Sequence, residues 1–236
     1  MIGLAMSTIT LAHVSDLHLP FEPLLSPLQR LSKRQLSSWA WRRRGALHRT
    51  EILEALKADL RVQGADHIVV TGDTANFSLP EEFRRAAIWL AALAPAAEIS
   101  LVPGNHDALV RVPAEQGLGR LAAFTRAEDG WPFVHRVGLL SLIGVNTARP
   151  TAPLLARGRI GAGQLSRLAT ILAAEREAGR IRIVLLHHPV ADGAVRWRKA
   201  LADRAALCDV LRREGAELLL HGHARDARFD AIAGPQ

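Results

Sequence analysis

The chain has 236 residues, of which 49% are hydrophobic and 22% are charged, enough for one α/β domain with a sizeable core. A single cysteine, Cys208, excludes an intramolecular disulfide framework and a cysteine-based metal site. The formal net charge of +7 favours anionic partners: phosphate esters, nucleic acid or an acidic membrane surface. No apolar stretch reaches the roughly 18 residues that span a bilayer, and no basic region precedes the first apolar run, so we expect a cytoplasmic protein.

Strand-like and helix-like patterns alternate along the chain. The apolar runs that predict strands lie at residues 8–14, 66–71, 98–102, 133–137, 139–145, 181–186 and 217–220. Helical periodicity covers residues 50–63, 80–93, 163–178 and 199–213. This alternation predicts packed α/β layers. We find no repeat and no clear boundary, so residues 1–236 are expected to form a single domain.

Residues 21–49 interrupt this alternation as a basic insertion. Within it, residues 28–44 fit a basic amphipathic helix that carries two tryptophans, Trp39 and Trp41. Such a helix could lie on an anionic membrane, which would make the protein peripheral there, or cover a substrate cleft. The alternative is an ordinary surface helix that packs on the core and leaves its basic residues in water.

Five short polar motifs each follow an apolar run. They read Asp16-Leu17-His18, Gly72-Asp73, Gly104-Asn105-His106-Asp107, His187-His188-Pro189 and His221-Gly222-His223. Parallel strands buried on both faces have continuous apolar sequences, and ligand sites in open α/β sheets lie beyond their carboxyl ends. The five motifs are therefore expected to converge at one edge, which would suit metal ions and a phosphorus ester.

The order and spacing of these motifs resemble the calcineurin-like metallophosphoesterases over nearly the whole chain. Among them, the closest resemblance is to bacterial members grouped with cyclic-nucleotide phosphodiesterases. The resemblance implies a four-layer α/β/β/α sandwich. It also implies hydrolysis of a phosphate ester, a diester rather than a monoester, by hydroxide that two divalent metal ions activate.

The resemblance also assigns roles to residues. It implies two metal positions that share Asp73, the first with Asp16 and His18, and the second with Asn105, His187 and His223. It makes His106 the catalytic acid, with Asp107 holding its ring. A carboxylate can bridge two cations about 3.5–4 Å apart. Imidazole and oxygen ligands favour Mn, with Fe or Zn as alternatives.

One motif departs from the family pattern. Where the family has Gly-His-x-His, this chain has Gly222-His223-Ala224-Arg225. A guanidinium has no free lone pair and cannot ligate a metal, so the first metal position is predicted to bind weakly. The chain also ends soon after this motif, whereas family members usually continue with further strands, so a shortened C-terminus is an additional expectation.

Two other functions stay open at this point. One is hydrolysis of a lipid-linked pyrophosphate, resembling UDP-diacylglucosamine hydrolase, because residues 28–44 would suit an interfacial substrate. The other is a degenerate, non-catalytic phosphate- or metal-binding protein, suggested by Arg225. Nucleic acid is a disfavoured partner because the sequence contains no aromatic-rich strand-binding module.

Overall fold

The computed structural model describes residues 8–43, 50–95 and 98–235. Its strands form two sheets, one parallel with the order β1-β2-β3 and one mixed with the order β4-β5-β6-β7, in which only the pair β4–β5 is antiparallel. The strand bounds are β1 Leu11–Val14, β2 His67–Val70, β3 Ile99–Leu101, β4 Phe133–Val137, β5 Leu140–Gly144, β6 Ile181–Leu185 and β7 Leu218–Leu220. Each lies within a run that the sequence predicted to be a strand.

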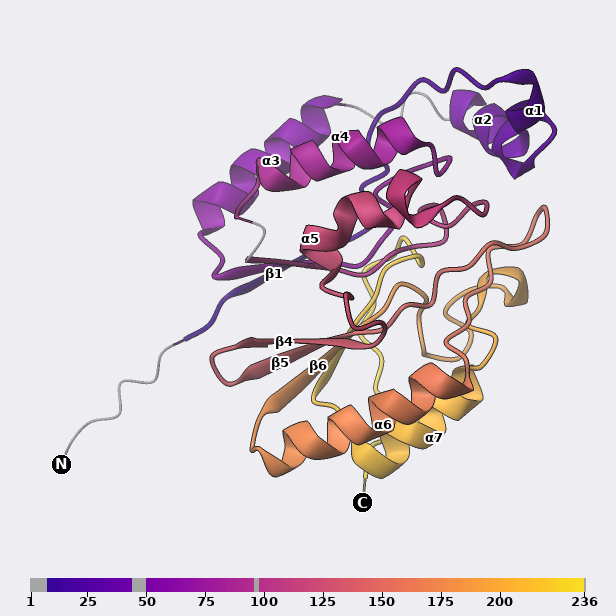
Figure 1. The fold of residues 1–236 in the computed structure, drawn as a ribbon. Helices are drawn as coiled ribbons and strands as arrows, with labels where there is room; N and C mark the ends of the chain where they lie inside the picture. Colours follow the sequence, from indigo (N-terminus) through magenta and orange to yellow (C-terminus); the bar gives the residue numbers. More distant parts are fainter. Residues whose placement is uncertain (1–7, 44–49, 96–97, 236) are drawn as a thin grey trace.

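Helices cover the outer face of each sheet (Figure 1). On the first sheet these are α3 (Thr50–Gln63) and α4 (Pro80–Ala91), and on the second they are α6 (Ala162–Glu177) and α7 (Arg204–Glu214). A third apolar cluster joins the facing sheets, with Val69 and Val102 from the first sheet and its neighbouring loop against Leu142 and Leu185 from the second. The layers are therefore helix, sheet, sheet, helix, which confirms the predicted α/β/β/α sandwich.

The last helix begins later than the sequence predicted. Residues 197–199 form a separate short 3-10 helix, η4 (Trp197–Lys199), and α7 starts at Arg204 rather than at residue 199. Between them, the backbone N–H of Ala202 donates to the carbonyl of Gly158, and the Asp203 carboxylate accepts from the N–H groups of Ile160 and Gly161. These contacts with a distant loop hold the chain out of the helical conformation. Three short helices follow the third motif: η2 (Ala114–Gln116), η3 (Leu118–Leu121) and α5 (Ala122–Thr125).

The basic segment forms two helices, α1 (Pro27–Arg30) and α2 (Lys33–Arg43), instead of one. Residues 44–49 of the predicted insertion lie outside the described residues. The apolar side chains do not pack on the core, because Leu28, Leu31, Leu36 and Trp39 are 81%, 86%, 41% and 58% exposed. The alternative of a surface helix that leaves its basic residues in water is wrong for one of them, because Arg34 is only 8% exposed. Among the described residues, no helix is long and apolar enough to cross a bilayer.

Candidate metal centre

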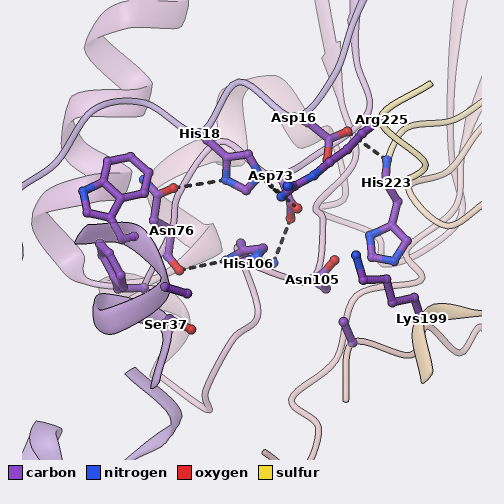
Figure 2. Close-up of a pocket in the computed structure, with 14 residues that line it drawn as sticks. Asp16, His18, Ser37, Asp73, Asn76, Asn105, His106, Lys199, His223 and Arg225 are labelled. Atoms are coloured by element: carbon purple, nitrogen blue, oxygen red, sulfur yellow. Dashed lines mark hydrogen bonds and ion pairs between the residues drawn. The ribbon is translucent and has the colours of Figure 1, made fainter. Parts of the chain in front are cut away.

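The five motifs converge beside one cavity of about 190 Å³. All the strands that precede them point to the same edge of the sandwich, where Figure 2 shows the side chains facing one another. The cavity lining includes six of the predicted site residues: Asp16, His18, Asp73, Asn105, His106 and His223. His187 lies beneath them and is fully buried. The sequence thus predicted correctly which distant residues come together.

The backbone turns sharply where the motifs follow their strands. Asp16, His18, Asp73 and His223 have positive φ angles of 53°, 42°, 55° and 66°. Non-glycine residues rarely adopt this left-handed region, and such strain clusters at functional sites. At Gly104 a side chain is excluded, because a Cβ atom there would overlap the Asp73 carboxylate. These turns direct the polar side chains toward the same cavity.

Hydrogen bonds fix the ring of His18 at the first position. Asn76 donates its amide nitrogen to the carbonyl of Leu19 at 2.8 Å, so its Oδ1 must accept, and His18 Nδ1 donates to it at 3.0 Å. Nε2 of His18 is therefore the unprotonated nitrogen of the neutral ring. It faces Asp73 Oδ2 at 3.7 Å. An imidazole lone pair and a carboxylate oxygen point at the same space.

The second position has the same arrangement with more donor atoms. His187 Nδ1 donates to the carbonyl of Thr71 at 2.7 Å, which leaves Nε2 unprotonated in the neutral ring. That Nε2 lies 3.2 Å from Asn105 Oδ1 and 3.5 Å from Asp73 Oδ2. His223 Nε2 is buried there and has no hydrogen-bond partner. Because buried polar atoms are rarely left unpaired, a nitrogen without a partner among the described residues fits a metal ligand.

Asp73 connects the two positions. Its Oδ1 accepts from the backbone N–H of His106 at 2.7 Å, while its Oδ2 faces both His18 and His187. Burial would raise the pKa of this carboxyl, but electrostatic interactions with the imidazoles of His187, His106 and His18 and the N–H bond from His106 lower it below its usual range. Asp73 is therefore an anion between two imidazoles, as a bridging ligand must be.

His18 and His223 are neutral near pH 7 in this environment. Burial lowers the pKa of His18 to about 4 and that of His223 to about 3, although Asp73 opposes the shift in both cases. A neutral imidazole is the form that binds metal. Two groups of side chains have ligand atoms close enough to hold an ion: His18, Asp73 and His106, and Asp73, His187 and His223. The donor set fits two divalent ions.

The first position includes the predicted ligand Asp16 and, beside it, the arginine that replaces a family ligand. Asp16 Oδ2 accepts from the Ser15 hydroxyl at 2.7 Å and from the backbone N–H of His223 at 2.8 Å, so this carboxylate also ties the end of β1 to the end of β7. Arg225 lies beside it with Nη2 3.4 Å from His18 Nε2. A guanidinium therefore lies at the lone pair that a first metal ion would use.

The predicted contact between Asp107 and the His106 ring is wrong. The Asp107 carboxylate accepts from the Thr74 hydroxyl and from the N–H groups of Ala75 and Gly104, all at 2.8 Å. His106 Nδ1 instead donates to the backbone carbonyl of Asn76 at 2.9 Å. Asp107 is buried and fixes the two motif loops relative to each other. Burial and the neighbouring Asp73 raise its pKa.

The choice of His187 over His188 agrees with the geometry. Both ring nitrogens of His188 contact other groups: Nδ1 lies 2.7 Å from the Thr147 hydroxyl and Nε2 lies 3.1 Å from the carbonyl of Ala156. His188 is fully buried, and burial lowers its pKa well below the usual value. Its ring therefore has no nitrogen left for a metal.

Sequence reasoning missed Asn76, which orients two site histidines at once. Its side chain holds His18 and its carbonyl holds His106. Glu82 in turn fixes this loop, since its carboxylate accepts from the N–H groups of Asn76, Phe77 and Leu79. Glu82 is the third residue of α4, and its carboxylate accepts from the backbone N–H of the N-cap residue Leu79, which is one half of a capping box. In the sequence, Pro80 and the two glutamates after it predicted the start of a helix. They did not predict that Glu82 would bind the backbone N–H groups of the preceding loop.

The chain matches the model of the calcineurin-like phosphoesterases over residues 9–224. It therefore belongs to this family of metallophosphoesterases and is a hydrolase that acts on phosphate ester bonds. The match covers every motif from Asp16 to His223. A search of curated proteins finds no match.

Solved structures share this fold. The chain is similar to a dimetal phosphatase from Danio rerio, with 15% identity and a TM-score of 0.54, over 90% of this chain and 80% of that one. It is also similar to an NAD nucleotidase from Haemophilus influenzae, with 11% identity, a TM-score of 0.46 and coverage of 91% and 38%. A 5′-nucleotidase precursor from Thermus thermophilus has 16% identity, a TM-score of 0.44 and coverage of 96% and 45%. The resemblance to the first of these concerns the fold alone.

Proposed function

We propose that the protein hydrolyses a phosphodiester with the help of divalent metal ions, Mn²⁺ first among them. The observation that carries this proposal is the convergence of unprotonated imidazoles, one shared carboxylate and the orphaned His223 Nε2. Bound metal ions would lower the pKa of water and neutralise charge on the phosphate. The resemblance of the motifs to the cyclic-nucleotide phosphodiesterase branch supports a diester rather than a monoester.

The chain's own residues would divide the work. Asp16, His18 and Asp73 would hold the first ion, and Asp73, Asn105, His187 and His223 the second. In its doubly protonated form, His106 would donate the Nε2 proton to the leaving oxygen, because the Nδ1 proton is held by the carbonyl of Asn76. Since His106 also belongs to a group of potential ligands, its role as acid is a proposal to be tested by metal content as well as by rate.

We expect unequal occupancy of the two metal positions. The Arg225 guanidinium adds positive charge beside His18 and supplies no ligand atom. The second position keeps four protein ligands. The first therefore binds its ion more weakly and needs water to complete its coordination.

One experiment tests the proposed function. Protein purified without added metal is analysed for its elemental content, then assayed with Mn²⁺ on a panel of phosphomonoesters and phosphodiesters. Hydrolysis of diesters that depends on Mn²⁺ supports the proposal. Bound metal without turnover of any ester would instead support a non-catalytic metal- or phosphate-binding protein.

A second candidate function is hydrolysis of a lipid-linked pyrophosphate at an anionic membrane, with the protein cytoplasmic and peripheral. The supporting observation is a set of exposed apolar side chains on and just before α1 and α2: Leu24, Leu28, Leu31, Leu36 and Trp39. Exposed Arg42 and Arg43 adjoin it on α2. Each basic residue near an anionic surface contributes about 1 kcal/mol. Co-sedimentation with anionic vesicles at low salt tests this candidate, and its absence for the unaltered protein would remove it.

A further inference from the structure

Helix α2 packs against the rest of the protein through polar side chains. An amphipathic helix usually packs through its apolar face instead. Arg34 and Ser38 are 8% and 3% exposed, whereas Trp39 is 58% exposed. Arg34 donates from Nε to the carbonyl of Phe77 at 2.8 Å and from Nη2 to the carbonyl of Ser78 at 2.7 Å. These charge-assisted bonds fix the buried polar face of α2 to the loop that follows Asp73.

A second anchor attaches α2 to the other half of the molecule. Lys33 Nζ donates to the Thr151 hydroxyl at 2.8 Å and to the carbonyl of Leu155 at 2.5 Å. Residues 151–155 follow β5 in the second sheet, while Phe77 follows β2 in the first. The helix therefore connects loops of both sheets beside the metal centre. Figure 1 shows α1 and α2 at this end of the sandwich.

This attachment places one aromatic side chain of α2 in the cavity wall. Ser37, Ala40 and Trp41 line the cavity, together with Phe77. The Trp41 and Phe77 rings meet edge to face, with centroids 5.8 Å apart and an interplanar angle of 76°. Trp41 is half-buried and Phe77 is only 1% exposed. A buried phenyl ring thus fixes the tilt of an indole that borders the cavity.

The two sides of the cavity differ in chemistry. Ser37 and Asn76 lie on the His106 side, and Lys199 lies on the His223 side (Figure 2). Phe77 directly follows Asn76, whose carbonyl holds the His106 ring. The aromatic wall and the candidate proton donor therefore belong to the same side. A leaving group that takes a proton from His106 would therefore lie on the side of the cavity that Trp41 and Phe77 line.

We propose that Trp41, supported by Phe77, binds the leaving group of the substrate, and that this group carries a flat aromatic ring. An indole next to a phenyl edge suits stacking of a planar ring. The cavity of about 190 Å³ lies below the 300–1,000 Å³ of typical small-molecule sites, so it has space for a phosphate and one ring rather than an acyl chain. This inference rests on the proposed phosphoesterase site for the position of phosphorus.

The test compares Trp41→Ala with Trp41→Phe and with Trp39→Ala, all loaded with Mn²⁺. Trp39 is the matched control because it lies on the same helix and points to solvent. Two soluble methyl phosphodiesters are assayed, one with an aryl leaving group and one with a fluorinated alkyl leaving group of equal acidity. Trp41→Ala should raise KM for the aryl ester about tenfold and leave KM for the alkyl ester unchanged. Trp41→Phe should recover part of the loss, and Trp39→Ala should change neither value.

A binding measurement separates this inference from the proposed function. Methyl benzylphosphonate and methyl ethylphosphonate cannot release their carbon-linked group, and calorimetry gives the Kd of each. The benzyl compound should bind about tenfold more tightly, and Trp41→Ala should remove that preference while Trp39→Ala keeps it. If no ester is hydrolysed but this preference is seen, the proposed function fails and the aromatic subsite stands. Equal binding of the two phosphonates, or equal loss of both in Trp41→Ala, overturns the subsite.

Discussion

The two metal positions use the same backbone device but differ in one side chain. The four proposed ligands of the second position, Asp73, Asn105, His187 and His223, are at most 7% exposed. The first position shares Asp73 and adds His18 and Asp16, yet the neighbouring residue that should complete it is Arg225, which is exposed and also has a positive φ of 64°. The fold brings the side chains of both proposed positions together, and we propose that the identity of one side chain decides how strongly the first can bind a metal ion.

Loss of the shared ligand should have the largest effect. Asp73→Ala removes the carboxylate that faces both His18 and His187, and Asn105→Ala removes a ligand of the second position alone. We expect each to lower hydrolysis of bis(p-nitrophenyl) phosphate by about 100-fold or more, since a bound metal supplies several kcal/mol of transition-state stabilisation. Asp192→Ala is the control, because the Asp192 side chain is 89% exposed. Activity within about tenfold of wild type in folded Asp73→Ala would contradict a bridged centre.

Replacement of His106 should have the next largest effect and should depend on the substrate. His106→Ala is expected to lower kcat by roughly 10²–10⁴-fold for esters with poor leaving groups, and by less for nitrophenyl esters that need no proton. Metal content measured on the same samples should equal that of the wild type. A loss of one metal ion would make His106 a ligand of the first position, and equal losses for all esters would exclude a role as acid.

The vesicle test should show a smaller effect that is confined to α1 and α2. Replacement of Arg42 and Arg43 by glutamine should weaken binding to anionic vesicles by up to about 30-fold, because each basic residue contributes about 1 kcal/mol. Replacement of Trp39 by alanine should weaken it by severalfold. Trp41→Ala should bind as the wild type does, since Trp41 lines the cavity. Co-sedimentation at low and high salt checks this. Equal weakening by Trp39→Ala and Trp41→Ala would mean that the helix itself had been disturbed.

The smallest effect concerns the pH dependence of stability without metal. Burial lowers the pKa of His18 to about 4 and that of His223 to about 3, whereas the unfolded chain titrates near 6.5. Between pH 6.5 and about 4 the unfolded state binds protons that the folded state does not, so the stability of the metal-free protein falls as pH falls. His18→Asn should flatten this dependence in urea unfolding. His67→Asn is the comparison variant, because His67 is a buried histidine at the far end of β2 with a pKa also lowered to about 4. It measures how much a histidine outside the metal centre contributes to the pH dependence of stability.

The sequence predicted the strands and the convergence of the motifs because both follow from local pattern. Apolar runs marked each strand, and parallel order placed their carboxyl ends together. The orientation of α2 could not be predicted, since Arg34 is buried by carbonyl groups 43 and 44 residues away. The same holds for Asn76 and Glu82, whose roles depend on where the loop after Asp73 lies. Local sequence periodicity does not predict polar contacts between residues that lie so far apart in the chain.

Metal stoichiometry tests the central claim most directly. Metal-free wild type, Arg225→His and Arg225→Gln are titrated with Mn²⁺ by calorimetry. The account predicts one tight and one weak site in the wild type, two tight sites in Arg225→His, and a modest gain in Arg225→Gln, which removes the charge without supplying an imidazole. Higher turnover should accompany the second ion in Arg225→His. Two tightly bound ions in the wild type would contradict the account, because the first position would then bind its metal without the histidine that this chain lacks.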